Sequence, residues 1–156
     1  MGGGQQMGGG QQMGGQQVSG QQMSGGTNMA LQDVETPQQR QAIESITRAM
    51  QVCGWCAEQC IQKADPMMIG CIRSCEDVIE LGETALALTP RQSQFAPSIL
   101  QTFAQAAEAC AQECGQHRDA HCQECAQVLP QAAQAARQFS GEIGQQSRQM
   151  QQQQLQ

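Results

Sequence analysis

The sequence predicts an all-α protein, an antiparallel up-down-up-down four-helix bundle with disordered N- and C-terminal tails. Four segments carry apolar residues or cysteines at every third or fourth position, the period of a helix that buries one face. Aromatic residues make up only 3% of the chain. A core of Ala, Ile, Leu, Met and Cys suits closely packed helices better than a β-sandwich, and short connections between helices favour antiparallel neighbours.

Capping signals delimit the four helices. Thr36 is a suitable cap residue, and Pro37 occupies the first helical position after it. Asp65 and Pro66 stop this helix and begin the next one. The predicted helices cover about residues 37–64, 66–88, 97–115 and 121–141.

Both ends of the chain have low complexity. The N-terminal segment repeats Met, Gly and Gln almost without charge, and cannot bury enough apolar surface to order itself. The C-terminal segment is mainly Gln. We therefore expect disordered tails at residues 1–36 and 145–156 around a bundle of residues 37–144. The first tail is either a simple flexible segment or, because its methionines recur regularly, a weak collector of Cu(I).

All nine cysteines fall into sets with helical spacing. Cys53, Cys56 and Cys60 stand at positions i, i+3 and i+7, on one face of the first helix. In an up-down bundle the connections near residues 65 and 119 lie at the same end. We therefore expect all nine thiols to converge in one half of the bundle: Cys53, Cys56, Cys60, Cys71, Cys75, Cys110, Cys114, Cys122 and Cys125, with His117, His121, Met67 and Met68 around its opening.

Converging thiols indicate a metal-ligand array, although a single buried cysteine is usually a small apolar residue. Structural zinc prefers a closed set of four ligands, and iron–sulfur clusters usually take cysteines from loops. Cu(I) accepts two or three soft ligands, so nine thiolates would hold roughly four ions, and more with bridging sulfurs. The sequence therefore predicts storage or buffering of Cu(I). The alternatives are an iron–sulfur electron carrier and a thiol-redox or zinc-binding scaffold.

Composition argues against several other functions. The net charge is −6 and the eight basic residues are scattered, so no nucleic-acid partner is expected. No apolar run is long enough for a membrane span, and no secretory signal is recognisable. We expect a cytoplasmic protein, whose thiols bind metal rather than form disulfides. Cys114 and His117 could pair as nucleophile and base, but nothing supplies an oxyanion hole, so catalysis is not expected.

The pattern of cysteines resembles that of the cysteine-rich four-helix-bundle copper-storage proteins, sometimes labelled ferredoxin-like. The resemblance covers about residues 40–140. It rests on Cys53-x₂-Cys56-x₃-Cys60, Cys71-x₃-Cys75, Cys110-x₃-Cys114 and His117-x₃-His121-Cys122-x₂-Cys125. It implies homotetramers that hold many Cu(I) ions inside the bundle, with the metal entering where Met67, Met68, His117 and His121 gather. It also leaves room for a copper donor or acceptor protein as a partner.

Two features depart from this pattern or remain outside it. Leu129 and Ala132 stand where members of the family often continue the cysteines of the last helix, so a short copper-lined channel and a lower capacity are expected. Trp55 points about 160° away from the inward face of the first helix. We expect this indole to lie at a contact between subunits.

Overall fold

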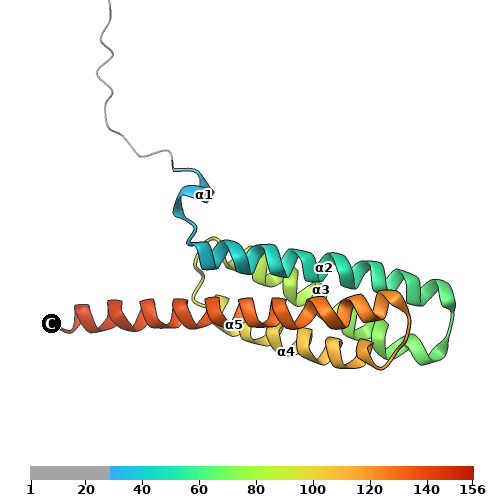
Figure 1. The fold of residues 1–156 in the computed structure, drawn as a ribbon. Coiled ribbons are helices and arrows are strands. Elements are labelled where there is room, and N and C mark those ends of the chain that lie inside the picture. The colour runs from blue at the N-terminus through green and yellow to red at the C-terminus, as the bar shows by residue number, and fades with distance from the viewer. Residues whose placement is uncertain (1–28) are drawn as a thin grey trace, which may run out of the picture.

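The structure, a computed structural model, describes residues 29–156 and within that range contains helices and no strand. The four long helices form an antiparallel bundle (Figure 1). In chain order the elements are α1 (Leu31–Val34), α2 (Pro37–Lys63), a 3₁₀ turn η1 (Pro66–Met68), α3 (Ile69–Leu88), α4 (Ala96–Gly115) and α5 (Ala120–Gln154).

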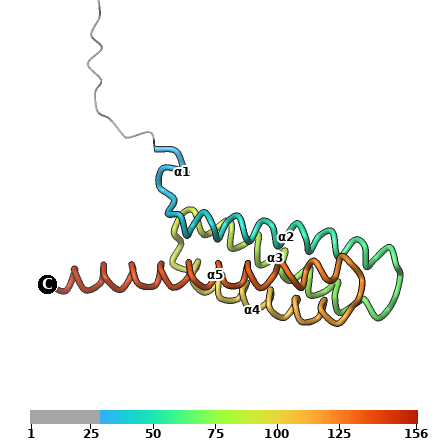
Figure 2. The backbone as a smooth tube through the Cα atoms, in the orientation of Figure 1, coloured from blue at the N-terminus to red at the C-terminus, as the bar shows by residue number. Residues whose placement is uncertain are grey.

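The helices follow the predicted up-down-up-down order. The connection from α2 to α3 and the connection from α4 to α5 lie at the same end of the bundle, on the right in Figure 1. The α3–α4 connection lies at the opposite end, beside the start of α2 (Figure 2). We call the first of these ends the thiol end, because the cysteines lie in the half of the bundle next to it.

Local hydrogen bonds account for the helix boundaries near the thiol end and at the start of α2. Thr36 Oγ1 accepts a hydrogen bond from the Gln39 amide at 3.1 Å, as expected of an N-cap. Ala64 closes α2 in the left-handed conformation, with φ of 51°. Asp65 Oδ1 then accepts from the Met67 amide at 2.9 Å and starts the turn that leads into α3. These short, capped connections keep α2 and α3 adjacent and antiparallel.

The bundle core has two parts of different chemistry. Towards the thiol end it consists largely of cysteines, all of them buried. The other half is hydrocarbon, and Ile46, Leu100, Phe103 and Leu129 are among its largest fully buried side chains. Small alanines on α4 and α5 fill the space between these residues. The apolar half holds the four helices together next to the thiols.

The ends of the chain differ from the prediction. The predicted disordered segment 1–36 contains the short helix α1, where Asp33 Oδ2 accepts a hydrogen bond from the Ala30 amide at 2.9 Å. The methionine repeat of residues 1–28 lies outside the described residues. The helix α5 continues to Gln154, so its end is not at the predicted boundary of residue 144. Glutamine is a good helix former, and extending a helix that packing has already nucleated costs little.

In the part of the chain that the structure describes, no helix combines the length and apolarity needed to cross a membrane.

Candidate metal centre

The thiols come from all four long helices. Within each helix the cysteines are three or four residues apart, so their side chains share one face, and this face points into the bundle. All nine are buried and none forms a disulfide. Three come from α2 and two from each of α3, α4 and α5. The predicted convergence of the nine thiols in one half of the bundle is therefore present in the structure.

The sulfur atoms lie within reach of shared metal ions. With a metal–sulfur bond of about 2.3 Å, two thiolates on one ion are roughly 3.7–4.6 Å apart. The Sγ atoms of Cys60 and Cys71 are separated by 3.7 Å, those of Cys75 and Cys110 by 3.7 Å, and those of Cys71 and Cys122 by 3.8 Å. The spacing needed for bridging thus exists without a large movement of the helices.

The thiols form three overlapping groups, which together we call the thiol ladder. In each group the ligand atoms lie within 4.8 Å of one another. Cys56 belongs to the first two groups and Cys75 to the last two. The groups, from the thiol end inward, are Cys56, Cys60, Cys71 and Cys122; Cys56, Cys75, Cys114 and Cys125; and Cys53, Cys75 and Cys110. Because Cys56 and Cys75 are shared, the ladder is one continuous array rather than a set of separate sites.

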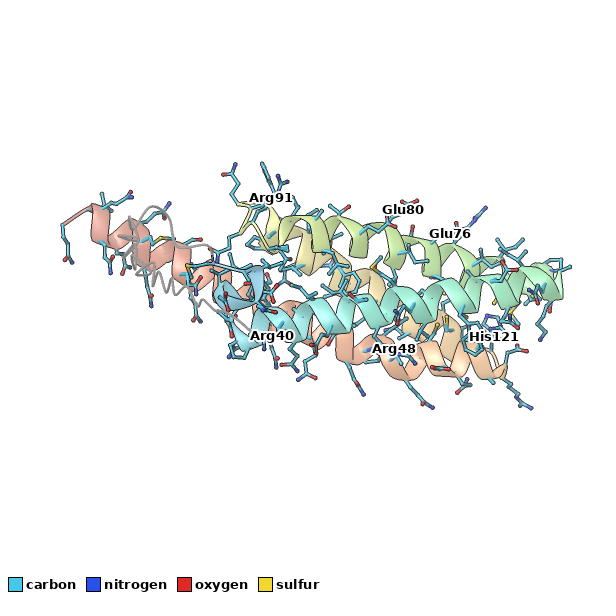
Figure 3. The ribbon with its side chains drawn as sticks, turned by 90° about the horizontal axis from the view of Figure 1, so that it is seen from above. Arg40, Arg48, Glu76, Glu80, Arg91 and His121 are labelled. Atoms are coloured by element: carbon cyan, nitrogen blue, oxygen red, sulfur yellow. The ribbon has the colours of Figure 1, made fainter. Side chains whose placement is uncertain are left out.

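His121 lies at the outer end of the ladder, and its label in Figure 3 marks the thiol end of the bundle. Its Nδ1 atom is 3.4 Å from the Sγ atoms of Cys56 and Cys122 and 3.8 Å from that of Cys60. The imidazole therefore adds one nitrogen to the outermost group of sulfurs. The first turn of α5 places it there, one residue before Cys122.

The other residues predicted at the opening do not all face the ladder. Met68 is buried, with 4% of its surface exposed, whereas Met67 is 74% exposed. The His117 Nε2 atom lies 3.6 Å from Glu113 Oε1, and His117 belongs to none of the candidate ligand groups among the described residues. The structure brings His121 to the thiols and buries Met68 in the core, whereas Met67 is exposed and His117, whose Nε2 atom is buried, lies outside the candidate ligand groups of the described residues.

Sequence reasoning did not single out Asp119. A carboxylate oxygen of Asp119 lies within 4.8 Å of ligand atoms of His121 and Cys122. The same carboxylate pairs with the Lys63 ammonium, which joins the last turn of α2 to the N-cap of α5 and holds the pKa of Asp119 below its usual value. The position of Asp119 as the residue before a helix was a signal that could have identified it.

Burial and mutual hydrogen bonds perturb the thiol pKa values. Loss of hydration is the largest cause at the opening, where it raises the pKa of Cys60 to about 11 and also raises the pKa of Cys122. Deeper in the ladder, hydrogen bonds from Cys110 and Cys125 lower the pKa of Cys114. The hydrogen bond between Cys110 and Cys114 raises the pKa of Cys110. A metal that binds these thiols must displace the protons that they carry.

Comparison with known proteins gives consistent results. A model of the family described as Csp, copper storage protein, matches residues 35–141. The structure is similar to apo-Csp3 (copper storage protein 3) from Bacillus subtilis, with a TM-score of 0.60 and 29% identity over 65% of this chain and 97% of that one. For the Cu(I)-bound copper storage protein BsCsp3 the TM-score is 0.63, with 28% identity over 66% and 98% of the two chains.

A third solved structure, the copper storage protein Ccsp from Streptomyces lividans loaded with 10 copper equivalents, has a TM-score of 0.64 and 25% identity. The match covers 74% of this chain and 92% of that one. No curated protein matches the sequence.

Proposed function

Because this chain belongs to the copper storage protein family, we propose that it stores or buffers several Cu(I) ions, bound by the thiolates of the thiol ladder. The single observation that carries this proposal is the overlap of the three thiol groups at Cys56 and Cys75. Cu(I) is satisfied by two or three soft ligands, and a sulfur shared between groups can bridge two ions.

The overlap also separates this proposal from a zinc site. A structural zinc ion needs four ligands of its own in a closed tetrahedron, whereas the two groups of four thiols have Cys56 in common. One zinc ion could therefore be fully ligated by either group, but not one in each without a bridging thiolate. A continuous array of thiols suits a row of Cu(I) ions better.

The described core supports a limited capacity. Leu129 and Ala132 continue the inward face of α5 beyond Cys125, and both are buried. Ile46 and Val78 are also buried hydrocarbon side chains in the same core, on α2 and α3. The copper-binding region therefore ends below the group of Cys53, Cys75 and Cys110, and nine thiolates would bind roughly four ions, or more with bridging.

We propose that the metal enters at the thiol end. His121 is the first-contact ligand, because its Nδ1 faces three thiols at 3.4–3.8 Å. Met68 supplies a thioether that is buried in the core. His117 and the exposed Met67 are outer groups that the ion passes on its way to His121.

The remaining parts of the proposal concern the protein's setting. A store of metal needs no catalytic group, so we propose a binding role rather than an enzymatic one. The nine cysteines are free thiols, and thiols stay reduced in the cytoplasm, so we propose a cytoplasmic location. We also propose that the chain forms a homo-oligomer, as the family resemblance implies. A further protein would donate copper to it or accept copper from it.

The test is an anaerobic titration of the reduced, metal-free chain with Cu(I) in the presence of a chromophoric Cu(I) chelator. We expect several equivalents to be withheld from the chelator, with a colourless product and a parallel loss of thiols that react with a thiol reagent. Parallel samples are titrated with Zn²⁺, or with Fe²⁺ and sulfide, instead of Cu(I). Retention of no more than a single Cu(I), or Zn²⁺ that Cu(I) does not displace, would contradict the proposal.

Adjacent residues of α3 supply a matched pair of variants. Cys75→Ala removes a thiol shared by two groups, and should lower the number of Cu(I) ions retained. Ser74→Ala changes a half-buried neighbour whose hydroxyl donates a hydrogen bond to the Gly70 carbonyl of its own helix, and should retain the same number of ions as the unaltered chain.

A further inference from the structure

Trp55 is the only tryptophan of the chain, and the residue after it is Cys56. Its indole is 45% exposed, while the His121 residue that it contacts is only 8% exposed. The two rings meet edge to face, with centroids 6.1 Å apart and an interplanar angle of 83°. An aromatic side chain from α2 thus covers the imidazole of α5 from the outside.

The contact with Trp55 helps to fix the orientation of the His121 imidazole, which the thiols alone would hold only weakly. The partners of Nδ1 are sulfur atoms at 3.4–3.8 Å, and thiols are weak hydrogen-bond partners that fix the direction of a ring poorly. An edge-to-face aromatic pair has a defined geometry and favours one orientation of each ring. Thiols on one side and the indole on another therefore leave the imidazole a single well-supported orientation.

We propose that Trp55 is a positioning residue for His121, holding the imidazole with Nδ1 towards the thiols and thereby setting the rate at which Cu(I) enters the ladder. The inference rests on the proposed function. It assigns the exposed indole a role within one subunit, whereas the sequence suggested a contact between subunits.

The size of the effect follows from the population of the competent orientation. A ligand that must wait for a partly populated conformation binds with an affinity reduced by that fraction. An aromatic edge-to-face contact changes such an equilibrium by about two- to tenfold. Loss of the indole should slow uptake of the first ions by about this factor and leave the final number of ions unchanged, because all nine thiols remain.

The experiment follows the anaerobic transfer of Cu(I) from a chromophoric chelate to the apo protein by stopped-flow absorbance. Trp55→Ala is expected to slow the transfer, and Trp55→Phe, which keeps an aromatic edge, to restore most of the rate. Ile61→Ala is the matched control, since Ile61 is an apolar residue of the same helix with 54% of its surface exposed. Its rate should equal that of the unaltered chain.

A double-mutant cycle distinguishes positioning from a general effect on the bundle. In a His121→Ala background, Trp55→Ala should cause no further slowing, because the ring that it orients is gone. An NMR cross-peak between the indole and imidazole protons of the unaltered apo protein is expected as well.

The proposal is overturned if Trp55→Ala transfers at the unaltered rate, slows equally in the His121→Ala background, or is matched by Ile61→Ala. Absence of the cross-peak would also overturn it. These outcomes are distinct from failure of the proposed function, in which the unaltered chain itself would take no Cu(I) from the chelate.

Discussion

Cys56 has more potential ligand neighbours than a cysteine at the inner end of the ladder. Its sulfur lies 3.6 Å from that of Cys71 and 3.9 Å from that of Cys122, and it also faces His121. It belongs to two thiol groups, whereas Cys53 belongs to one. The importance of a thiol in this array depends on how many groups share it.

Replacement of these two cysteines should therefore have unequal effects. Cys56→Ala removes a bridging position and is expected to lose about two Cu(I) ions, while Cys53→Ala shortens the ladder at its inner end and should lose about one. Competition with a Cu(I) chelator measures both numbers. Equal losses would show that the groups do not share Cys56.

Proton displacement predicts how affinity changes with pH. Burial raises the pKa of Cys60 to about 11 and raises that of Cys122, so both are protonated at neutral pH and must lose a proton to bind metal. Their affinity for Cu(I) should rise with pH and fall on acidification, by about tenfold per pH unit for each proton displaced. Chelator competition over a range from about pH 6 to about pH 8 measures how the affinity for Cu(I) changes with pH. A flat profile would mean that the bound thiols were already ionised.

At the scale of the helices, the surroundings of two glycines predict different tolerance of a side chain. A Cβ at Gly54 of α2 would have only Ile79 Cδ1 nearby, at 3.9 Å, whereas one at Gly82 of α3 would lie 2.8 Å from Met50 Cγ and Sδ. Alanine is favoured over glycine inside a helix by about 1 kcal/mol. Gly82 provides the room that Met50 occupies between α2 and α3.

Gly54→Ala is expected to stabilise the protein by about 0.5–1 kcal/mol. Gly82→Ala forces Met50 to move, and the cost of overpacking, about 1–3 kcal/mol, cancels or exceeds the same gain. Urea unfolding of the two apo variants provides the comparison. If Gly82→Ala were the more stable variant, Met50 would have an equally good alternative position.

The sequence identified the helices well where a local signal exists. Thr36 and Asp65 are caps whose hydrogen bonds depend on nearby residues, and both form as expected. The end of α5 was missed, because the Gln-rich segment lacks an apolar face and resembles a tail, although glutamine extends an existing helix readily. Periodicity detects burial, and it cannot detect a helix that protrudes into solvent.

At the scale of the whole molecule, the topology carries the site. The convergence of the nine thiols could be predicted from the up-down order of the helices and their short connections, without knowledge of any contact. The orientation of single side chains at the opening could not be predicted from the sequence in this way. Met67 and Met68 are adjacent and chemically identical, and only the turn from η1 into α3 decides that Met68 is buried. The contact of Trp55 with His121 depends on the rotation of α2 relative to α5, which no local pattern encodes.

The separation of the core into two halves predicts that folding does not depend on metal. Ile46, Leu100, Phe103 and Leu129 are buried without any contribution from a ligand, unlike the core of a zinc finger, which is unfolded without its ion. The apo and Cu(I)-loaded proteins should show the same far-UV circular dichroism. Binding adds stability, about 4 kcal/mol when free metal exceeds Kd a thousandfold, so loading should raise Tm.

Two variants test this division between the halves. Leu100→Ala should lower stability by about 2–5 kcal/mol in both states and leave the number of retained Cu(I) ions unchanged. Cys75→Ala should instead reduce the rise of Tm on loading, because it removes a thiol shared by two groups. Thermal scans of each variant with and without Cu(I) measure both effects. An apo protein without helical signal would show that the hydrocarbon half cannot hold the bundle and that the metal does.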